Sequence, residues 1–89
     1  MRESSITDEK MEAIYKQIGL NVKKLRTEQG ISQLTLSLAI GHKAVGTVSM
    51  AEIGLNKKHF NLEHLVKIAD VLEVEVCVLM EGIQPSFPL

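Results

Sequence analysis

The sequence GISQLTLSLAIGHKAVGTVSMAEIG, at residues 30–54, decides the fold of this chain. Ser32 is a favourable N-cap for a short helix over residues 33–40, and Gly41 supplies its stop. The next few residues fit either a turn or a first helical turn, and the apolar pattern then predicts a helix over residues 44–53. Leu36, Ala39 and Ile40 are expected to face inward, and Val48, Ala51 and Ile53 form the apolar pattern of the second helix.

Longer amphipathic helices are predicted on both sides of this segment. Thr7 or Asp8 can cap the first helix, which runs to Gly30, and Asn61 can cap the next helix after a polar loop over residues 55–60. Their apolar stripes are Met11, Ile14, Ile18, Val22 and Leu25 in the first and Leu62, Leu65, Val66, Ala69 and Leu72 in the second. The body should therefore be helical throughout.

All five residues between Glu75 and Glu81 are apolar, so the periodicity of this segment does not assign it. Because a lone strand in an otherwise helical chain has no partner, the expectation is a short fifth helix that ends at Gly82. A helix at the edge of a monomer buries only one face, so part of this apolar surface should remain uncovered. Together with a tail over residues 83–89, it predicts a homodimer interface formed by Val76, Val78, Leu79, Met80 and Phe87.

Length and composition limit the class of protein. With 89 residues, 45% of them hydrophobic, one core is possible, which predicts a single domain over residues 1–89 with a helical body at 8–82. No apolar run approaches the roughly 18 to 20 residues of a membrane span, and no secretion signal is recognisable, so a cytoplasmic protein is expected. The single cysteine and three histidines share no metal-ligand spacing. With no nucleophile–base pair or phosphate-binding loop, we expect no metal, no cofactor and no enzymatic activity.

Charge is distributed unevenly along the chain. The net charge is -1 at pH 7, which taken alone does not indicate a nucleic-acid partner. Residues 16–60, however, carry seven basic and two acidic groups, whereas residues 1–15 carry two and four and residues 61–89 carry one and five. The basic middle segment favours a polyanion partner, although solvated helix faces would give the same pattern.

Two short helices joined by a glycine-containing turn are typical of a motif that places one helix in the major groove of DNA. Over roughly residues 14–82 the sequence resembles the Cro/repressor family of helix-turn-helix proteins, the XRE family. The matching residues are Ile18, Gly19, Val22, Lys23, Lys24, Leu25, Arg26, Gly30, Ile31, Ser32, Gln33, Leu36, Gly41, Val48, Ser49, Glu52, Gly54, Leu65, Ile68, Ala69, Leu72 and Val74. The resemblance implies an all-α, compact five-helix, lambda-repressor-like domain that binds double-stranded DNA and regulates transcription, most simply as a repressor.

The resemblance also implies which residues contact DNA. Base-reading positions in the helix over residues 44–53 fall near Val45, Gly46, Ser49 and Met50, with Ala44 and Thr47 as their neighbours. The turn between Gly41 and Val48 is one residue longer than is usual in the family. None of the residues from Ala44 to Met50 is an Arg, Gln or Asn able to contact guanine or adenine in a bidentate way, which leaves methyl and hydroxyl contacts or DNA shape. Gly46 also has a purely structural interpretation as a turn glycine. Contacts to the phosphate backbone are expected from Gln33, Lys43, Asn56, Lys57 and Lys58.

Two charged residues have a structural interpretation. The resemblance implies that Arg26 and Glu52 form an ion pair that links the first helix to the end of the recognition helix and does not read DNA. A second function remains open on the same fold, a protein-interaction module of the antitoxin or adaptor type. The apolar surface over residues 44–50 and the acidic C-terminal part favour that alternative.

Overall fold

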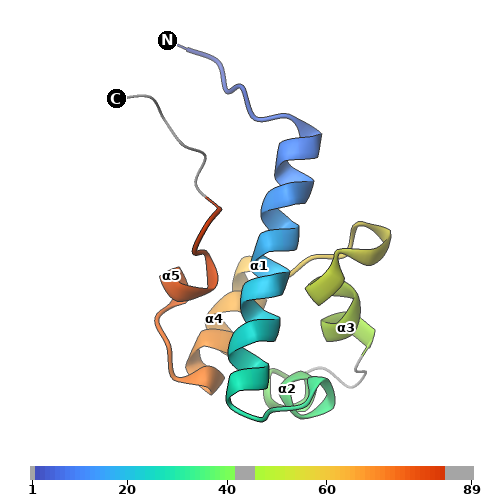
Figure 1. Cartoon of the computed structure of the whole chain (residues 1–89), viewed down its shortest axis with the longest axis vertical. Coiled ribbons are helices and arrows are strands. Elements are labelled where there is room, and N and C mark those ends of the chain that lie inside the picture. The colour runs from blue at the N-terminus through green and yellow to red at the C-terminus, as the bar shows by residue number, and fades with distance from the viewer. Residues whose placement is uncertain (1, 42–45, 84–89) are drawn as a thin grey trace.

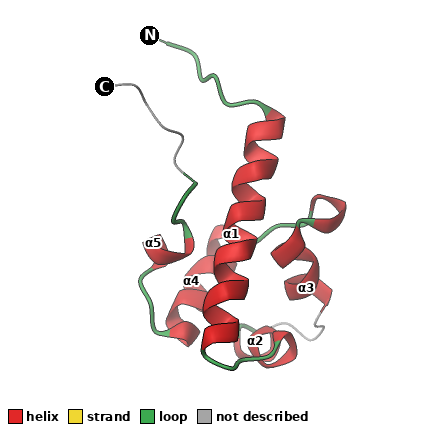
Figure 2. Cartoon of the chain, in the orientation of Figure 1, coloured by secondary structure: helices red, strands yellow, loops and turns green. Residues whose placement is uncertain are grey.

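The computed structural model describes residues 2–41 and 46–83, without the side chain of Asn56, and this part of the chain is built from helices and connecting loops (Figure 2). The elements are α1 (Asp8–Glu28), α2 (Gln33–Ala39), α3 (Gly46–Ile53), the short 3-10 helix η1 (Leu55–Lys57), α4 (Leu62–Leu72) and α5 (Val76–Leu79). The predicted all-α class with five α-helices is confirmed. No helix of the described part has both the length and the hydropathy that a bilayer span needs.

Side chains of the predicted capping residues begin three of the helices. Thr7 rather than Asp8 caps α1, because its hydroxyl accepts the backbone N–H of the third helical residue at 3.2 Å. The Ser32 hydroxyl does the same for α2 at 3.0 Å. The Asn61 side chain accepts from the backbone N–H of His64 at 2.8 Å, and the His64 ring accepts from the backbone N–H of Asn61 at 3.2 Å. Each bond satisfies a backbone donor that has no partner within its helix.

The helix α1 forms the axis of the molecule (Figure 1). In this view α3 lies on one side of it, α4 and α5 lie on the other, and α2 crosses near its C-terminal end. The first turns of α1 project beyond the other helices. The buried apolar side chains of the described part are Ile18, Val22, Leu36, Ile40, Val48, Ala51, Phe60, Leu65, Ile68, Ala69, Leu72 and Leu79.

Four residues of the predicted apolar patterns are exposed, and three of them, Ala39, Leu62 and Val66, were expected in the core. Ala39 is exposed at the end of the two-turn helix α2, and Ile53 is 53% exposed at the end of α3. On α4, Leu62 and Val66 are 66% and 49% exposed. The latter two are four residues apart and share one face of the helix. The core-facing stripe of α4 is rotated away from that face and includes the fully buried Ile68.

The boundaries of two predicted elements also differ. The helix predicted over residues 75–81 is shorter, because Glu75 is the N-cap of α5 and Met80 its C-cap. The loop predicted over residues 55–60 begins with η1. The first described residue of α3 is Gly46, so the predicted start of that helix at residue 44 lies outside the described residues.

Leu79 of α5 corrects part of the predicted homodimer interface. Its side chain is fully buried in the core of the chain, so it is not available to a partner. An all-apolar helix contains no polar residue that marks which side faces inward, and the sequence therefore did not separate Leu79 from its neighbours.

Gly19 allows α1 and α3 to approach closely. A Cβ atom at this position would lie 2.5 Å from the backbone oxygen of Glu52 and 2.6 Å from that of Ala51. Both neighbours are backbone atoms of α3, so a side-chain rotation does not relieve the clash. The glycine therefore sets the distance at which α3 packs on the axis of the molecule.

We predict that Gly19→Ala destabilises the protein even though alanine is the better helix former. Alanine gains about 1 kcal/mol of helix propensity over glycine, but the added methyl group forces α3 away at a cost of about 1–3 kcal/mol or more. The matched control is Gly46→Ala at the first residue of α3, where an added Cβ has no neighbour within 4 Å. Thermal unfolding should show a lower Tm for the first variant and not for the second; equal Tm values would contradict the role given to Gly19.

Candidate nucleic-acid interface

The side of α3 that faces away from the core is accessible and uncharged. Val48 and Ala51 are buried on the inner side. Gly46 and Met50 are half-buried, and Thr47 is exposed. This surface therefore offers a threonine hydroxyl, a thioether and methyl groups, but no charged group, to a molecule that approaches α3.

Ser49 lies at the edge of the same surface. Its hydroxyl donates to the backbone oxygen of Gly46 at 3.1 Å, inside the helix. The proton of this hydroxyl is thus in use, and the oxygen can still accept a hydrogen bond. The other predicted base-reading residues, Ala44 and Val45, and the predicted backbone contact Lys43 lie outside the described residues.

A buried network of charged and polar groups holds α1, α2 and α3 together. Arg26 Nε donates to Glu52 Oε2 at 2.7 Å and Arg26 Nη2 donates to Glu52 Oε1 at 3.0 Å, a bidentate ion pair. The Glu52 carboxylate is fully buried and the Arg26 side chain is 9% exposed. Arg26 Nη1 also donates to the backbone oxygen of Ile31 at 2.8 Å, in the loop before α2.

Gln33, the first residue of α2, belongs to this network. Its side-chain Nε2 donates to Glu52 Oε1 at 2.9 Å, and the residue is half-buried. A primary amide has two N–H groups, so one remains for another acceptor. The predicted contact of Gln33 with a phosphate stays a prediction, and in the unbound protein its orientation is set by Glu52.

Exposed lysines lie near α3 on two elements. Lys57 and Lys58 are exposed and follow α3 directly, after a turn at Gly54 with φ +70°. Lys16 and Lys23 are exposed on α1. At helical spacing they lie on the same side as Gly19, the side that contacts α3. Neither of these two lysines has a predicted role beyond its place in the basic segment of the sequence.

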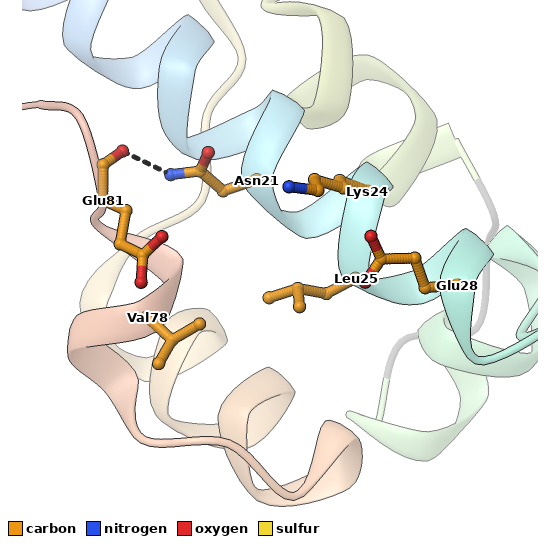
Figure 3. A pocket seen from close by; sticks show the side chains of 6 residues that line it. All are labelled: Asn21, Lys24, Leu25, Glu28, Val78 and Glu81. Carbon is orange, nitrogen blue, oxygen red and sulfur yellow. Dashed lines mark hydrogen bonds between the residues drawn. The ribbon is translucent and has the colours of Figure 1, made fainter.

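The opposite side of α1 contacts α5 (Figure 3). Asn21, a residue with no predicted role, joins the two helices. Asn21 Nδ2 donates to the backbone oxygens of Leu79 at 2.9 Å and Glu81 at 2.8 Å. Gln17 Nε2 donates to Asn21 Oδ1 at 3.0 Å and so orients the amide. Lys24 lies on this side, beside a small cavity of about 80 Å³, and not on the side of α3. A lone asparagine in an amphipathic helix gives no sequence signal of such a role.

Among the side chains of the described residues, no three of His, Cys, Asp or Glu gather closely enough to hold a metal ion. The accessible surfaces formed by α3 and η1 instead consist of small polar groups, lysines and apolar side chains, which include the exposed Ile53 and Leu55. Such a surface can bind another macromolecule through shape, hydrogen bonds and charge.

Comparison with known proteins identifies the family. A family model described as helix-turn-helix matches residues 22–79. The chain belongs to this family. The crystal structure of the restriction-modification controller protein C.AhdI from Aeromonas hydrophila is similar, with 30% sequence identity and a TM-score of 0.67 over 75% of this chain and 97% of that chain. No curated protein sequence matches. The resemblance to XRE-type helix-turn-helix proteins is confirmed, and the helix-turn-helix protein is a DNA-binding transcriptional regulator.

In this helix-turn-helix protein, loss of the buried ion pair should cost far more stability than loss of an exposed one. Arg26→Ala leaves the Glu52 carboxylate buried and unpaired, which costs about 3–5 kcal/mol. The matched control is Lys67→Ala, which removes an ion pair to Glu63 whose side chains are 50% and 74% exposed. That pair contributes about 0.3–0.5 kcal/mol. Denaturant unfolding measures both values, and DNA binding should be lost in the first variant only as far as folding is lost. A stable Arg26→Ala protein that fails to bind would make Arg26 a contact residue instead.

Proposed function

We propose that this regulator binds specific DNA sequences by placing α3 in the major groove and acts as a repressor by occupying a promoter. The observation that carries the proposal is the accessible outer side of α3 on a helix whose inner side is tied to α1 and α2 through Glu52. An α-helix fits the major groove of B-form DNA, whose width is about 12 Å. Because the network holds α3 rigidly, little conformational freedom is lost on binding.

Sequence preference would come from Thr47, Ser49 and Met50 among the described residues. Methyl and thioether groups can contact the thymine methyl, and hydroxyl groups can pair with either base edge. A bidentate base contact contributes about 1–3 kcal/mol of discrimination, and none of these side chains makes one. Part of the preference is therefore assigned to DNA shape and deformability.

The phosphate backbone would be contacted on either side of α3. Lys57 and Lys58 follow the helix, and Gln33 begins α2 with one amide N–H still unpaired within the protein network. Lys43 and Asn56 are proposed for the same backbone contacts from their positions in the sequence, as are Ala44 and Val45 for base contacts. The similarity to a restriction-modification controller protein favours the genes of such a system as the regulated targets.

A homodimer is proposed as the binding unit, since two-fold pairing places two recognition helices in successive major grooves about 34 Å apart. With Leu79 in the core, the candidate contacts on α5 are Val76, Val78 and Met80, all half-buried. Val78 is the best of the three, because the other two pack against the core cluster of their own chain. Phe87 lies outside the described residues, and its contribution to the dimer stays a prediction.

The alternative function, a protein-interaction module, is favoured by one observation. Leu34 and Leu38 on α2 are 52% and 60% exposed, and their spacing of four residues puts them on one face of the helix. Two neighbouring exposed leucines can anchor a protein partner. A protein partner could bind this face of α2 while α3 contacts DNA only if it approached α2 from the side that faces away from the duplex.

Selection from a random duplex library at two salt concentrations tests the two functions. Enrichment of specific sites is expected, and substitution of Met50 or Ser49 should change which sites are enriched. Retention that is salt-sensitive but unselective would reject sequence-specific regulation. If the preference survives substitution of every residue from Ala44 to Met50, direct readout by this helix is rejected.

Removing the two lysines after α3 should weaken DNA binding without changing its sequence preference. If Lys57 and Lys58 each neutralise one phosphate, the Lys57→Ala/Lys58→Ala variant should flatten the slope of log K against log salt by about 1.8. Lys24→Ala is the matched control, since Lys24 lies on the α5 side of α1. Binding isotherms across a salt series give the slopes. An unchanged slope in the double variant would mean that this loop does not touch DNA.

The proposed dimer predicts a charge-sensitive position on α5. Val78→Asp should convert the dimer to a 9.9 kDa monomer, because a carboxylate in an apolar interface is costly to desolvate. Leu38→Asp on the exposed face of α2 is the control and should leave the dimer intact. Sedimentation at micromolar concentration measures the mass. A wild-type monomer under these conditions would reject the dimer altogether.

A further inference from the structure

An apolar groove of about 400 Å³ lies between the first half of α1 and the start of α4. Its lining includes Met11, Ile14, Tyr15, Leu62, Leu65 and Met80. Leu62, at its rim, is 66% exposed, the largest exposure among the exposed large apolar residues of the described part. Tyr15 stacks on His59, with ring centroids 3.7 Å apart, so one face of the tyrosine ring is covered by the histidine.

A second hollow of about 230 Å³ continues from this groove along α1. It is lined by Ile6, Lys10, Ala13, Ile14 and Ile83, so the two hollows share Ile14. Ile83 is the last described residue before 84–89. The chain therefore leaves the described structure from the wall of an apolar surface that nothing in that structure fills.

The sequence that follows Ile83 suits such a surface. Residues 84–89 are QPSFPL, with no charged side chain, two large apolar side chains at Phe87 and Leu89, and two prolines. Prolines restrict the unfolded chain to extended conformations, which lowers the entropy cost of docking. Six residues reach about 20 Å when extended, and Phe87 is four residues from Ile83, which lines the second hollow.

We propose that residues 84–89 pack into the groove of their own chain, with Phe87 as the anchor. A segment tethered by so few residues is present at the groove at an effective concentration in the millimolar range. A second copy of the chain at micromolar concentration competes poorly with it. The docked segment covers the rim at Leu62 and ties the projecting start of α1 to α4. This contact removes Phe87 from the dimer interface predicted from the sequence and leaves α5 to form the proposed dimer.

Disulfide formation tests where Phe87 lies. In a Cys77→Ser background, which removes the only cysteine, Ser86→Cys, next to the anchor Phe87, is combined with Leu62→Cys in the groove. The matched control combines Ser86→Cys with Leu20→Cys, at an exposed leucine of α1 that is not part of the groove lining. The groove pair should crosslink within one chain at least about tenfold faster than the control pair. Equal rates, or a crosslink that joins two chains, would overturn the proposal.

Tyrosine fluorescence gives a second readout that needs no cysteine. Tyr15 lines the groove and is the only tyrosine, and the chain has no tryptophan. If the segment covers the groove, Phe87→Ser should raise the quenching of Tyr15 by acrylamide, and Leu38→Ser on α2 should not. Protection in the unchanged protein should be independent of its concentration. Protection that develops only as the concentration rises, or quenching that Phe87→Ser leaves unaltered, would overturn the proposal whether or not the protein binds DNA.

Discussion

The buried ion pair between Arg26 and Glu52 is the interaction on which the helix-turn-helix depends. Its groups join three elements, because Arg26 also bonds the loop before α2 and Glu52 also bonds the first residue of α2. A carboxylate with no exposed surface needs these donors, since burial without them costs several kcal/mol. The main effect of the pair is therefore to specify one arrangement of α1, α2 and α3, and its contribution to net stability is secondary.

The central helix separates two surfaces. Gly19 and Asn21 are two residues apart on α1 and therefore about 200° apart around its axis. Gly19 admits the backbone of α3 on one side, and Asn21 binds backbone oxygens next to α5 on the other. The proposed DNA surface and the proposed dimer surface thus lie on opposite sides of one rigid rod. Because α1 is one continuous helix, it fixes the position of the proposed DNA surface relative to the proposed dimer surface, with no flexible joint between them.

Features that depend on a single residue and its neighbours could be predicted from the sequence. The caps Ser32 and Asn61 and the stop at Gly41 mark helix ends, because the capping bond is formed within one turn. The direction of burial could be predicted for α1, where apolar and polar residues alternate at helical spacing. On α4 a wide apolar stripe left two directions possible, and Leu62 and Val66 are outside the core because the position of α1 and α5 decides the direction.

Contacts between segments that are far apart in the chain could not be predicted from the sequence. The distance between Asn21 and Leu79 along the chain is 58 residues, and neither residue type indicates the contact. The hydrogen bond from Gln33 to Glu52 is of the same kind. The site residues of α3 could be named only from the resemblance, since methyl groups, a hydroxyl and a thioether carry no chemical signature of DNA binding.

The composition of α3 limits how the regulator can recognise a site. Specific DNA-binding proteins prefer their sites over other DNA by about 4–10 kcal/mol. One copy of α3 with Thr47, Ser49 and Met50, the last two only half-exposed, offers no bidentate pair toward that total. Two copies on one duplex double each small contribution, and a fixed spacing between them adds a requirement on the shape of the intervening DNA. Because the side chains of α3 discriminate only weakly between bases, the proposed function depends most on pairing through α5.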